Sequence, residues 1–537
     1  MKNNIIILES VLTTQEVEEM VNFLQAIHTT EELIDLLFSK FKIDCTNDQS
    51  IVKGFDRDNS NIKGNAEAIC RPKNEKECSI ILFSCQIIKI PITISAGRTN
   101  LNGSATPMGG VVVSIEKLVT PKIKLNFKNK TVISPVGIYL EDMRNEILNL
   151  SQNKLYYPVD PTSRKESMIG GNLSCNASGF VPGPQGATRY WTHSLDFLTL
   201  DGYKISCSRG QYISKDKKFI LKSDIENKVL QIPNYRRPKI KNASGPYSCH
   251  NGEIDLVDLI IGSEGIFGLI TSVTFRLKEM PNSFLDLFII LPTERNAIDL
   301  HKYILNYFDN DLSKISALEY FGYNCQNYMK NREYLFKNKN EVGIYLQIPL
   351  INESIDYAGG VWLEILANSN CGIDEDRILW LNEKRNWDIF FEARHSIPVN
   401  ALEKTRLMDT CSILTDTIVP VNNFDSFLNK THDIIQKSKI EYILFGHLGD
   451  CHLHFHLIPT NSQQNIALMV YDKIIDLTHE LGGVYSAEHG TGKRKRSDFL
   501  KCYGSEGVES LTVTKKSFDP DFLLNRGNVI DFELNNK

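Results

Sequence analysis

A histidine-rich stretch is the part of this sequence best suited to chemistry. His452, His454 and His456 occupy alternate positions in a strand-like segment, and His447 lies just before them. Because residues two apart in a strand share a face, the sequence predicts that these three imidazoles line up on one side of a sheet. Downstream, Ala487-Glu488-His489-Gly490 adds a carboxylate and another imidazole. Such groups together indicate a zinc-like metal site, and hydrogen-bonded core histidines are the alternative.

Three glycine-containing loops in the first half form a second group of candidate residues. They span residues 96–104, 169–172 and 262–268, and each combines glycine with small hydroxyl or amide side chains. Because glycine has no Cβ, such loops let backbone N–H groups approach a phosphate closely. None of the loops is GxGxxG opening a long helix or GxxxxGK[ST], so neither a Rossmann site nor a P-loop is indicated. A tight turn is the alternative interpretation of any one loop alone.

The segments that must hold these groups differ in texture along the chain. Residues 1–50 are predicted to form a helical appendage, with capping patterns at Thr13-Thr14-Gln15-Glu16 and Thr29-Thr30-Glu31-Glu32. From residue 51 onward, short strand patterns alternate with glycine loops. The spacing there predicts helices and strands: helices over 75–88 and 137–150, and strands over 92–94 and 111–115.

Length and composition restrict the class of protein. A chain of 537 residues is too long for one ordinary core, so two or three structural units are expected. The net charge of −5 argues against a nucleic-acid-binding protein. The one tight basic cluster, Lys493 to Arg496, directly follows the Glu-His pair, where it either faces solvent or contacts an anion or a partner.

Cysteine usage and hydropathy point to the compartment. The 12 cysteines are scattered without any CxxC spacing, which argues against an iron–sulfur cluster of the ferredoxin type and against a disulfide framework. No stretch reaches the roughly 18 apolar residues of a membrane span, since the most apolar one, 257–275, carries two acidic residues. We therefore expect a cytoplasmic protein without a membrane span.

These motifs together resemble a known family of flavoproteins. Residues 96–107 resemble the pyrophosphate loop of the vanillyl-alcohol-oxidase, or PCMH-type, FAD fold. Residues 157–161, 169–179 and 186–189 resemble its second flavin segment, and 258–270 its third. The branch that the chain resembles most is the FAD-linked D-2-hydroxyacid dehydrogenases. This branch includes D-lactate dehydrogenase, D-2-hydroxyglutarate dehydrogenase and the flavin-binding, GlcD-type component of glycolate oxidase.

The resemblance implies an α+β fold with several units. Residues 51–277 would form the PCMH-type FAD-binding domain. Residues 278–507 would form the FAD-linked oxidase C-terminal, or cap, domain with the metal and catalytic segment. Residues 508–537 would return to the FAD domain. Residue by residue, the resemblance implies flavin contacts from Gly97, Arg98, Thr99, Asn100, Leu101, Asn102, Gly103, Ser104, Pro161, Gly170, Gly171, Asn172, Asn176, Ser178, Gly179, Gly186, Thr188, Glu264, Gly265, Ile270 and Asn525.

The resemblance also implies the chemical roles. His447, His454 and Glu488 match the family's ligands for a divalent metal, zinc or manganese, and His489 matches its catalytic base. Arg394 matches a position associated with the substrate carboxylate. These roles suit the oxidation of a 2-hydroxy acid, in which an imidazole takes the hydroxyl proton while a metal stabilises the oxygen and the cofactor accepts the electrons.

The sequence also departs from the family pattern. Cys451-His452 replaces a common Gly-Asn, so His452 is a second candidate ligand. Residues 411–415 contain no basic residue before Asp416, where relatives often have lysine, which leaves a second carboxylate contact unassigned. The first loop has no histidine to tether the flavin, so FAD is expected to be noncovalent. Arg98 stands where glycine is frequent and either reaches the pyrophosphate or points to solvent.

The expected activity is FAD-dependent oxidation of a D-2-hydroxy acid, D-lactate or glycolate first. The electrons would pass to a separate acceptor: an electron-transfer flavoprotein, a cytochrome or an iron–sulfur subunit. A redox-neutral flavin transferase of the same fold and a flavin-binding subunit without turnover are the alternatives.

Overall fold

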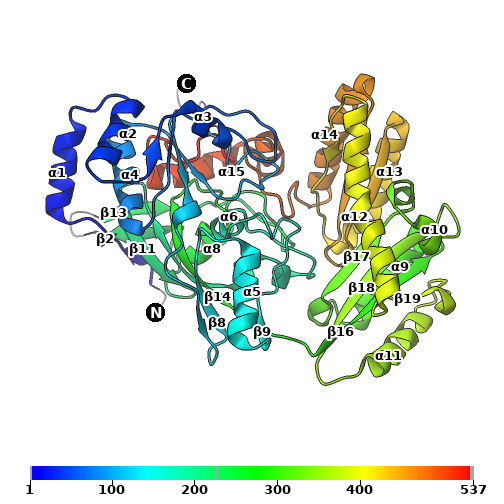
Figure 1. Cartoon of the computed structure of the whole chain (residues 1–537). Coiled ribbons are helices and arrows are strands. Elements are labelled where there is room, and N and C mark those ends of the chain that lie inside the picture. The colour runs from blue at the N-terminus through cyan, green and yellow to red at the C-terminus, as the bar shows by residue number, and fades with distance from the viewer. Residues whose placement is uncertain (1–2, 224–226, 532–537) are drawn as a thin grey trace.

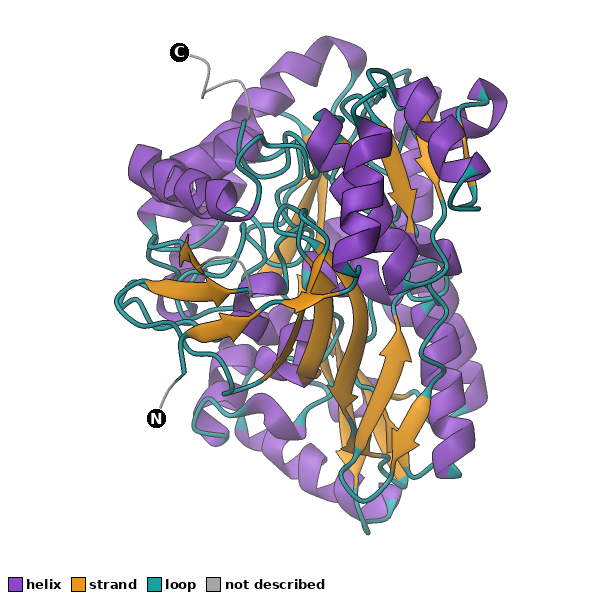
Figure 2. Cartoon of the chain, turned by 90° about the vertical axis from the view of Figure 1, so that its left-hand side faces the viewer, coloured by secondary structure: helices purple, strands orange, loops and turns teal. Residues whose placement is uncertain are grey.

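Two lobes make up the molecule (Figure 1). The computed structural model describes residues 3–223 and 227–531. The first lobe contains the N-terminal half and the C-terminal helix, and the second contains the residues between them. Strands run through the middle of the molecule while most helices lie on the outside (Figure 2). Within the described ranges, no helix combines the length and apolarity needed to cross a membrane.

The first lobe is built from two main sheets with helices around them. A four-stranded sheet has the order β3-β4-β6-β5, with β4 and β5 both parallel to β6. A six-stranded antiparallel sheet has the order β2-β11-β10-β14-β8-β7, and smaller sheets join β1-β12-β13 and β15-β9. The strands are β1 (Ile5–Ile7), β2 (Glu9–Ser10), β3 (Cys45–Thr46), β4 (Ala68–Cys70), β5 (Ile92–Ser95), β6 (Val111–Ser114), β7 (Lys124–Asn126), β8 (Thr131–Pro135), β9 (Leu155–Tyr156), β10 (Thr192–Leu198), β11 (Tyr203–Ser208), β12 (Lys218–Lys222), β13 (Asn227–Gln231), β14 (Leu269–Arg276) and β15 (Lys278–Glu279). The helices are α1 (Thr14–Leu24), α2 (Thr30–Ser39), α3 (Gln49–Val52), α4 (Glu75–Ile88), α5 (Leu140–Ser151), α6 (Ile169–Cys175), α7 (Thr188–Trp191), α8 (Leu256–Ile260) and α15 (Arg496–Phe518).

The N-terminal segment differs from the purely helical appendage that the sequence predicts. Both predicted capping boxes are present, at Thr13 and Thr29. However, β1 pairs with β12 and β2 pairs with β11, so the segment completes two sheets of the first lobe. Leu33 and Leu37 of α2 are fully buried in the same core as the strands that carry the first glycine loop. Two- and three-residue strands give too short an alternation to be recognised in a sequence.

The second lobe is one antiparallel sheet covered by helices on both faces. The seven strands have the order β19-β16-β18-β17-β21-β22-β20. Along β16, Leu285, Leu287 and Ile289 enter a core shared with α9, α11, α13 and α14, whereas Phe288 and Ile290 enter a core shared with α12. This alternation follows from the two-residue period of a strand. The elements are β16 (Ser283–Leu291), β17 (Ala317–Phe321), β18 (Val342–Leu350), β19 (Leu379–Trp380), β20 (Ile413–Leu414), β21 (Glu441–His447), β22 (His452–Ile458), α9 (Glu294–Tyr307), α10 (Arg332–Leu335), α11 (Ile355–Asn368), α12 (Lys384–Leu407), α13 (Phe424–Ser438) and α14 (Gln464–Glu480).

The chain then returns to the first lobe through α15. Phe518, the last residue of this helix, stacks on Phe267 with ring centroids 4.8 Å apart. Asn525 follows it and accepts a hydrogen bond from the backbone N–H of Ile94 at 2.8 Å. The return therefore brings the C-terminal residues next to the first glycine loop.

Candidate functional site

A β-hairpin positions the histidines. β21 and β22 are antiparallel, with His447 opposite His452, and a single 3-10 turn (Leu448–Asp450) joins them. Cys451 completes the turn in the left-handed conformation, at φ 57°. His454 lies two residues further along β22, on the same face as His452, so their ring centroids are only 4.5 Å apart. The predicted strand of alternating histidines is present.

Four side chains gather here in an arrangement that can hold a metal ion. Ligand atoms of His447, His452, His454 and Glu488 all lie within 4.8 Å of one another. The Nε2 atoms of His447 and His454 are each 3.5 Å from a Glu488 carboxylate oxygen. This set of imidazoles with one carboxylate fits a zinc- or manganese-like ion.

The two outer histidines are held by their other ring nitrogens. His447 Nδ1 lies 2.6 Å from Glu319 Oε1, and His454 Nδ1 lies 3.1 Å from the carbonyl of Thr415. Each bond turns Nε2 toward Glu488, as partners of metal-binding histidines commonly do. Burial works against protonation of His447, but Glu319 and Glu488 raise its pKa to about 10. A metal ion therefore has to displace a proton from this ring.

His452 and His456 are both buried and differ in position. His452 is fully buried, and neither of its ring nitrogens has a hydrogen-bond partner among the described residues. Its Nε2 lies 3.1 Å from Asp416 Oδ1 without hydrogen-bond geometry. Burial and nearby His454 lower the pKa of His452 to about 3, so this ring is neutral. His456, further along β22, lies outside the four-residue group.

His489 borders the same group. Its Nδ1 lies 3.5 Å from Asp416 Oδ2, its Nε2 lies 3.5 Å from Glu488 Oε1, and its ring stacks on that of His454. Burial lowers the pKa of His489, and the carboxylates of Asp416 and Glu488 oppose this shift. The ring is therefore neutral near pH 7 and can accept a proton.

Asp416 is a buried carboxylate that organises the Glu-His segment, and sequence reasoning assigned it no role. It accepts hydrogen bonds from the backbone N–H of His489 at 3.0 Å and from Ser486 Oγ at 2.6 Å. The ammonium of Lys495 lies 3.0 Å away. Burial alone would raise the pKa of Asp416, but His489 and Lys495 hold it well below its usual range. Asp416 is thus a fixed negative charge beside the ring of His489.

Lys241 and Glu319 are further residues that sequence reasoning missed. Lys241 is almost fully buried, and its Nζ lies 3.2 Å from Glu488 Oε2 and 3.5 Å from Asp450 Oδ2. The two residues come from different lobes, since Lys241 belongs to the first lobe and Glu319 to β17. No local motif marks either of them, although Lys241 lies within a Lys- and Arg-rich stretch.

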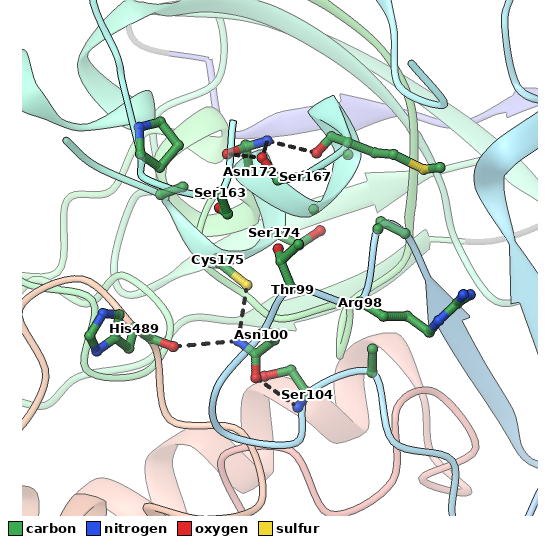
Figure 3. Close-up of a pocket in the computed structure, with 18 of the residues that line it drawn as sticks. Arg98, Thr99, Asn100, Ser104, Ser163, Ser167, Asn172, Ser174, Cys175 and His489 are labelled. Carbon is green, nitrogen blue, oxygen red and sulfur yellow. Dashed lines mark hydrogen bonds between the residues drawn. The ribbon is translucent and has the colours of Figure 1, made fainter. Parts of the chain in front are cut away.

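The glycine loops surround a cavity of about 540 Å³ that reaches the histidine cluster. Figure 3 shows Asn100, Ser174 and Cys175 around this cavity, with His489 at one side of it. The Nδ2 of Asn100 donates to the backbone carbonyl of His489, so the first loop and the catalytic segment are joined directly. The predicted cofactor and metal segments therefore meet at one place.

The first loop has the features of a phosphate cradle. None of the backbone N–H groups of residues 97–101 donates to another atom in the described part of the chain. A Cβ on Gly97 would stand 2.3 Å from the carbonyl oxygen of Glu166, so only glycine allows this approach. A run of free N–H groups at the wall of a cavity fits an FAD pyrophosphate.

The predicted flavin-contact residues fall into two groups. Most of them line the cavity: Gly97, Arg98, Thr99, Asn100, Leu101, Ser104, Pro161, Gly170, Gly171, Asn172, Ser178, Gly179, Glu264, Gly265, Ile270 and Asn525. The others, Asn102, Gly103, Asn176, Gly186 and Thr188, lie behind it. Asn102, for example, donates to the carbonyls of His489 and Gly490, so it holds the wall instead of forming it.

Two arginines among the predicted residues are placed against aromatic rings. The guanidinium of Arg98 lies 4.3 Å from the centroid of Phe55. That of Arg394, on α12, lies 4.5 Å from the centroid of Phe180, which itself lines the cavity next to His447. Arg394 thus stands close to the cavity mouth without lining it.

Comparison with known proteins gives two family matches. Residues 66–208 match the model of an FAD binding domain, and residues 372–529 match the model described as FAD linked oxidases, C-terminal domain. These matches confirm the predicted α+β fold with a PCMH-type FAD-binding domain and a C-terminal oxidase domain.

Relatives of known name cover nearly the whole chain. A D-lactate dehydrogenase of Anaerostipes hadrus is 26% identical over 90% of this chain and 92% of its own length. The glycolate oxidase subunit GlcD of Bacillus subtilis is 24% identical over 86% and 88%. A D-2-hydroxyglutarate dehydrogenase of Stutzerimonas stutzeri is 24% identical over 86% and 90%.

Solved structures of the same fold have lower identity. The structure of p-cresol methylhydroxylase with substrate bound has a TM-score of 0.65 at 14% identity and covers 99% of this chain and 100% of its own. An alkyldihydroxyacetonephosphate synthase has a TM-score of 0.60 at 14% identity and covers 96% and 85%. At this identity the likeness concerns the fold alone.

Proposed function

We propose that this chain, which belongs to the FAD-linked oxidase family, oxidises a D-2-hydroxy acid to the 2-oxo acid. It is an FAD-linked oxidoreductase, and D-lactate and glycolate are the first substrates to test. Relatives named D-lactate dehydrogenase and glycolate oxidase support this choice.

One observation carries the proposal: a neutral imidazole stands between a fixed carboxylate and a set of metal donors. Because His489 Nδ1 faces Asp416, the ring proton belongs on Nδ1, and Nε2 can accept the hydroxyl proton of the substrate. Asp416 then stabilises the positive charge that the ring gains. FAD, when bound, supplies the acceptor for the two electrons.

His447, His454 and Glu488 are proposed to hold the divalent metal, which supplies positive charge that favours loss of the hydroxyl proton. Glu319 and Thr415 fix the orientation of the two rings. Arg394 is proposed to attract the substrate carboxylate toward the cavity, because a guanidinium matches a planar carboxylate. The metal, its ligand set and the role of Arg394 are proposals.

The experiment that tests the proposed function is an anaerobic screen of D- and L-2-hydroxy acids for loss of the yellow flavin colour. We expect at least one D-2-hydroxy acid to bleach the flavin, and its L-enantiomer to do so far more slowly. Flavin that no 2-hydroxy acid reduces would instead favour a flavin-binding subunit without turnover.

The purified protein is expected to release FAD when it is denatured. The first loop offers free backbone N–H groups for the pyrophosphate and has no histidine to form a covalent tether. Acid precipitation followed by chromatography of the supernatant is the measurement. Flavin that stays with the denatured chain would contradict the noncovalent assignment, and FMN in place of FAD would remove the proposed role of the loop.

Steady turnover is expected with an artificial dye acceptor and not with NAD. The sequence has no Rossmann fingerprint and no cysteine spacing for a cluster relay, so a separate electron-transfer flavoprotein, cytochrome or iron–sulfur subunit is the proposed acceptor. Measuring both acceptors with the same substrate provides the comparison. Efficient NAD reduction by the isolated chain would overturn this part of the proposal. A cytoplasmic location stays a prediction.

A further inference from the structure

A second cavity lies next to the histidine cluster, between the two lobes. Its volume is about 1050 Å³. Residues 183–190 and 236–251 of the first lobe form part of its lining, and residues 419–421 and 449–451 of the second lobe face them. None of the three glycine loops contributes to it.

The charges around this cavity are strongly unbalanced. Among the described residues, its lining contains seven Arg and Lys side chains and only two carboxylates, those of Asp258 and Asp450. Asp258 lies 2.9 Å from Arg209 and 3.7 Å from Arg189, and Asp450 lies 3.5 Å from Lys241. Three of the cations thus share all the negative charge that the lining provides.

Two of the remaining arginines are held by backbone carbonyls. Arg237 donates to the carbonyl oxygens of Asn242, Ser244, Gly245 and Pro246. Arg276 donates to the carbonyl of Tyr190. Carbonyl oxygens fix the orientation of a guanidinium but leave its full positive charge uncompensated.

The other two cations, Arg236 and Lys239, have exposed side chains. Neither forms an ion pair with a carboxylate in the described part of the chain. The crowding of positive charge is also felt inside: burial lowers the pKa of Arg189 to about 10, Asp258 opposes the shift, and Arg237 and Arg209 add to it.

We propose that this cavity binds a small polyanion, a molecule with several phosphate or carboxylate groups. Guanidinium groups in fixed orientations match such oxyanions in two-pronged hydrogen bonds. A concave site lined by one sign of charge also raises the local concentration of the opposite ion. Its volume is that of a small-molecule site. The site does not depend on the proposed oxidation, although Lys241 links it to Glu488.

Tyr247 adds a ring between two of the cations. The guanidinium of Arg189 lies 4.7 Å from its centroid and that of Arg237 lies 5.5 Å away. These contacts keep the guanidinium groups in place at the wall, so that little ordering remains to be done when the anion binds.

The test is calorimetric titration of the FAD-loaded protein with tripolyphosphate and, separately, with tricarballylate, a tricarboxylate. The flavin blocks the other cavity, and an ionic strength of about 0.15 M suppresses nonspecific attraction. We expect saturable binding of at least one probe. The tighter of the two identifies whether phosphate or carboxylate groups are the natural ligand.

Substitution of Arg236→Gln together with Lys239→Gln is expected to weaken that binding about tenfold or more. The matched control is Lys384→Gln with Arg385→Gln, an exposed pair on α12 with the same loss of charge, which should change binding less than about twofold. Absence of saturable binding by either probe would overturn the proposal. Equal weakening by the two double variants would overturn it as well, because it would show attraction to net charge alone.

Discussion

Replacing His489 with alanine is expected to slow reduction of the bound flavin by a 2-hydroxy acid about 10²-fold or more. The variant removes the imidazole that stands 3.5 Å from both Asp416 and Glu488. Its FAD content should be unchanged, because the contact between this residue and the first loop is made by its backbone carbonyl, which alanine keeps. Stopped-flow absorbance of the flavin under anaerobic conditions gives the rate.

The matched control for this substitution is His479→Ala. His479 is an exposed histidine in the last turn of α14 and lies outside the histidine cluster. Its variant should reduce flavin at the wild-type rate. If His489→Ala also reduces flavin at that rate while retaining FAD, His489 is structural and the proposed base is wrong.

Local signals in the sequence predicted the elements around the site well. The helix predicted over 75–88 is α4 with the same bounds, because Asn74 caps its first turn and Lys89 ends it in the left-handed conformation. The predicted strands at 92–94 and 111–115 correspond to β5 and β6. Caps, apolar spacing and proline all act within a few residues, so a sequence shows them directly.

Contacts between distant segments could not be predicted in the same way. Glu319 orients His447 across the β17–β21 pair, and Asp416 orients His489 from a loop 73 residues away. Strand order in a seven-stranded sheet decides both contacts, and no local pattern encodes it. Lys241 reaches Glu488 from the other lobe, which only the packing of the lobes reveals.

The histidine strand shows the limit of periodicity. Alternation correctly predicted that His452, His454 and His456 belong to one strand, yet His456 lies outside the group that can share an ion. A residue four positions along a strand is displaced by roughly 13 Å, so one face of a strand is longer than a metal site. The turn before β22 decides which end of the strand meets Glu488.

The same geometry ranks the ligands, and metal analysis of single variants tests that ranking. His454→Ala is expected to lower bound zinc or manganese at least about tenfold, because Nε2 of His454 faces Glu488 and its Nδ1 is fixed by Thr415. His456→Ala, on the same strand, is the matched control and should retain the metal.

His452→Ala should cause a smaller loss than His454→Ala, since Nε2 of His452 lies against Asp416 at 3.1 Å, whereas the Nε2 atoms of His447 and His454 face Glu488. Full occupancy in His454→Ala, with loss in His452→Ala or His456→Ala, would contradict the assignment of His447, His454 and Glu488. The ion would then be held one position to the other side of the hairpin, where Asp416 replaces Glu488 as the carboxylate within reach of His452. His489 would in that case share its carboxylate partner with the metal, and its neutral ring could not be set by Asp416 alone.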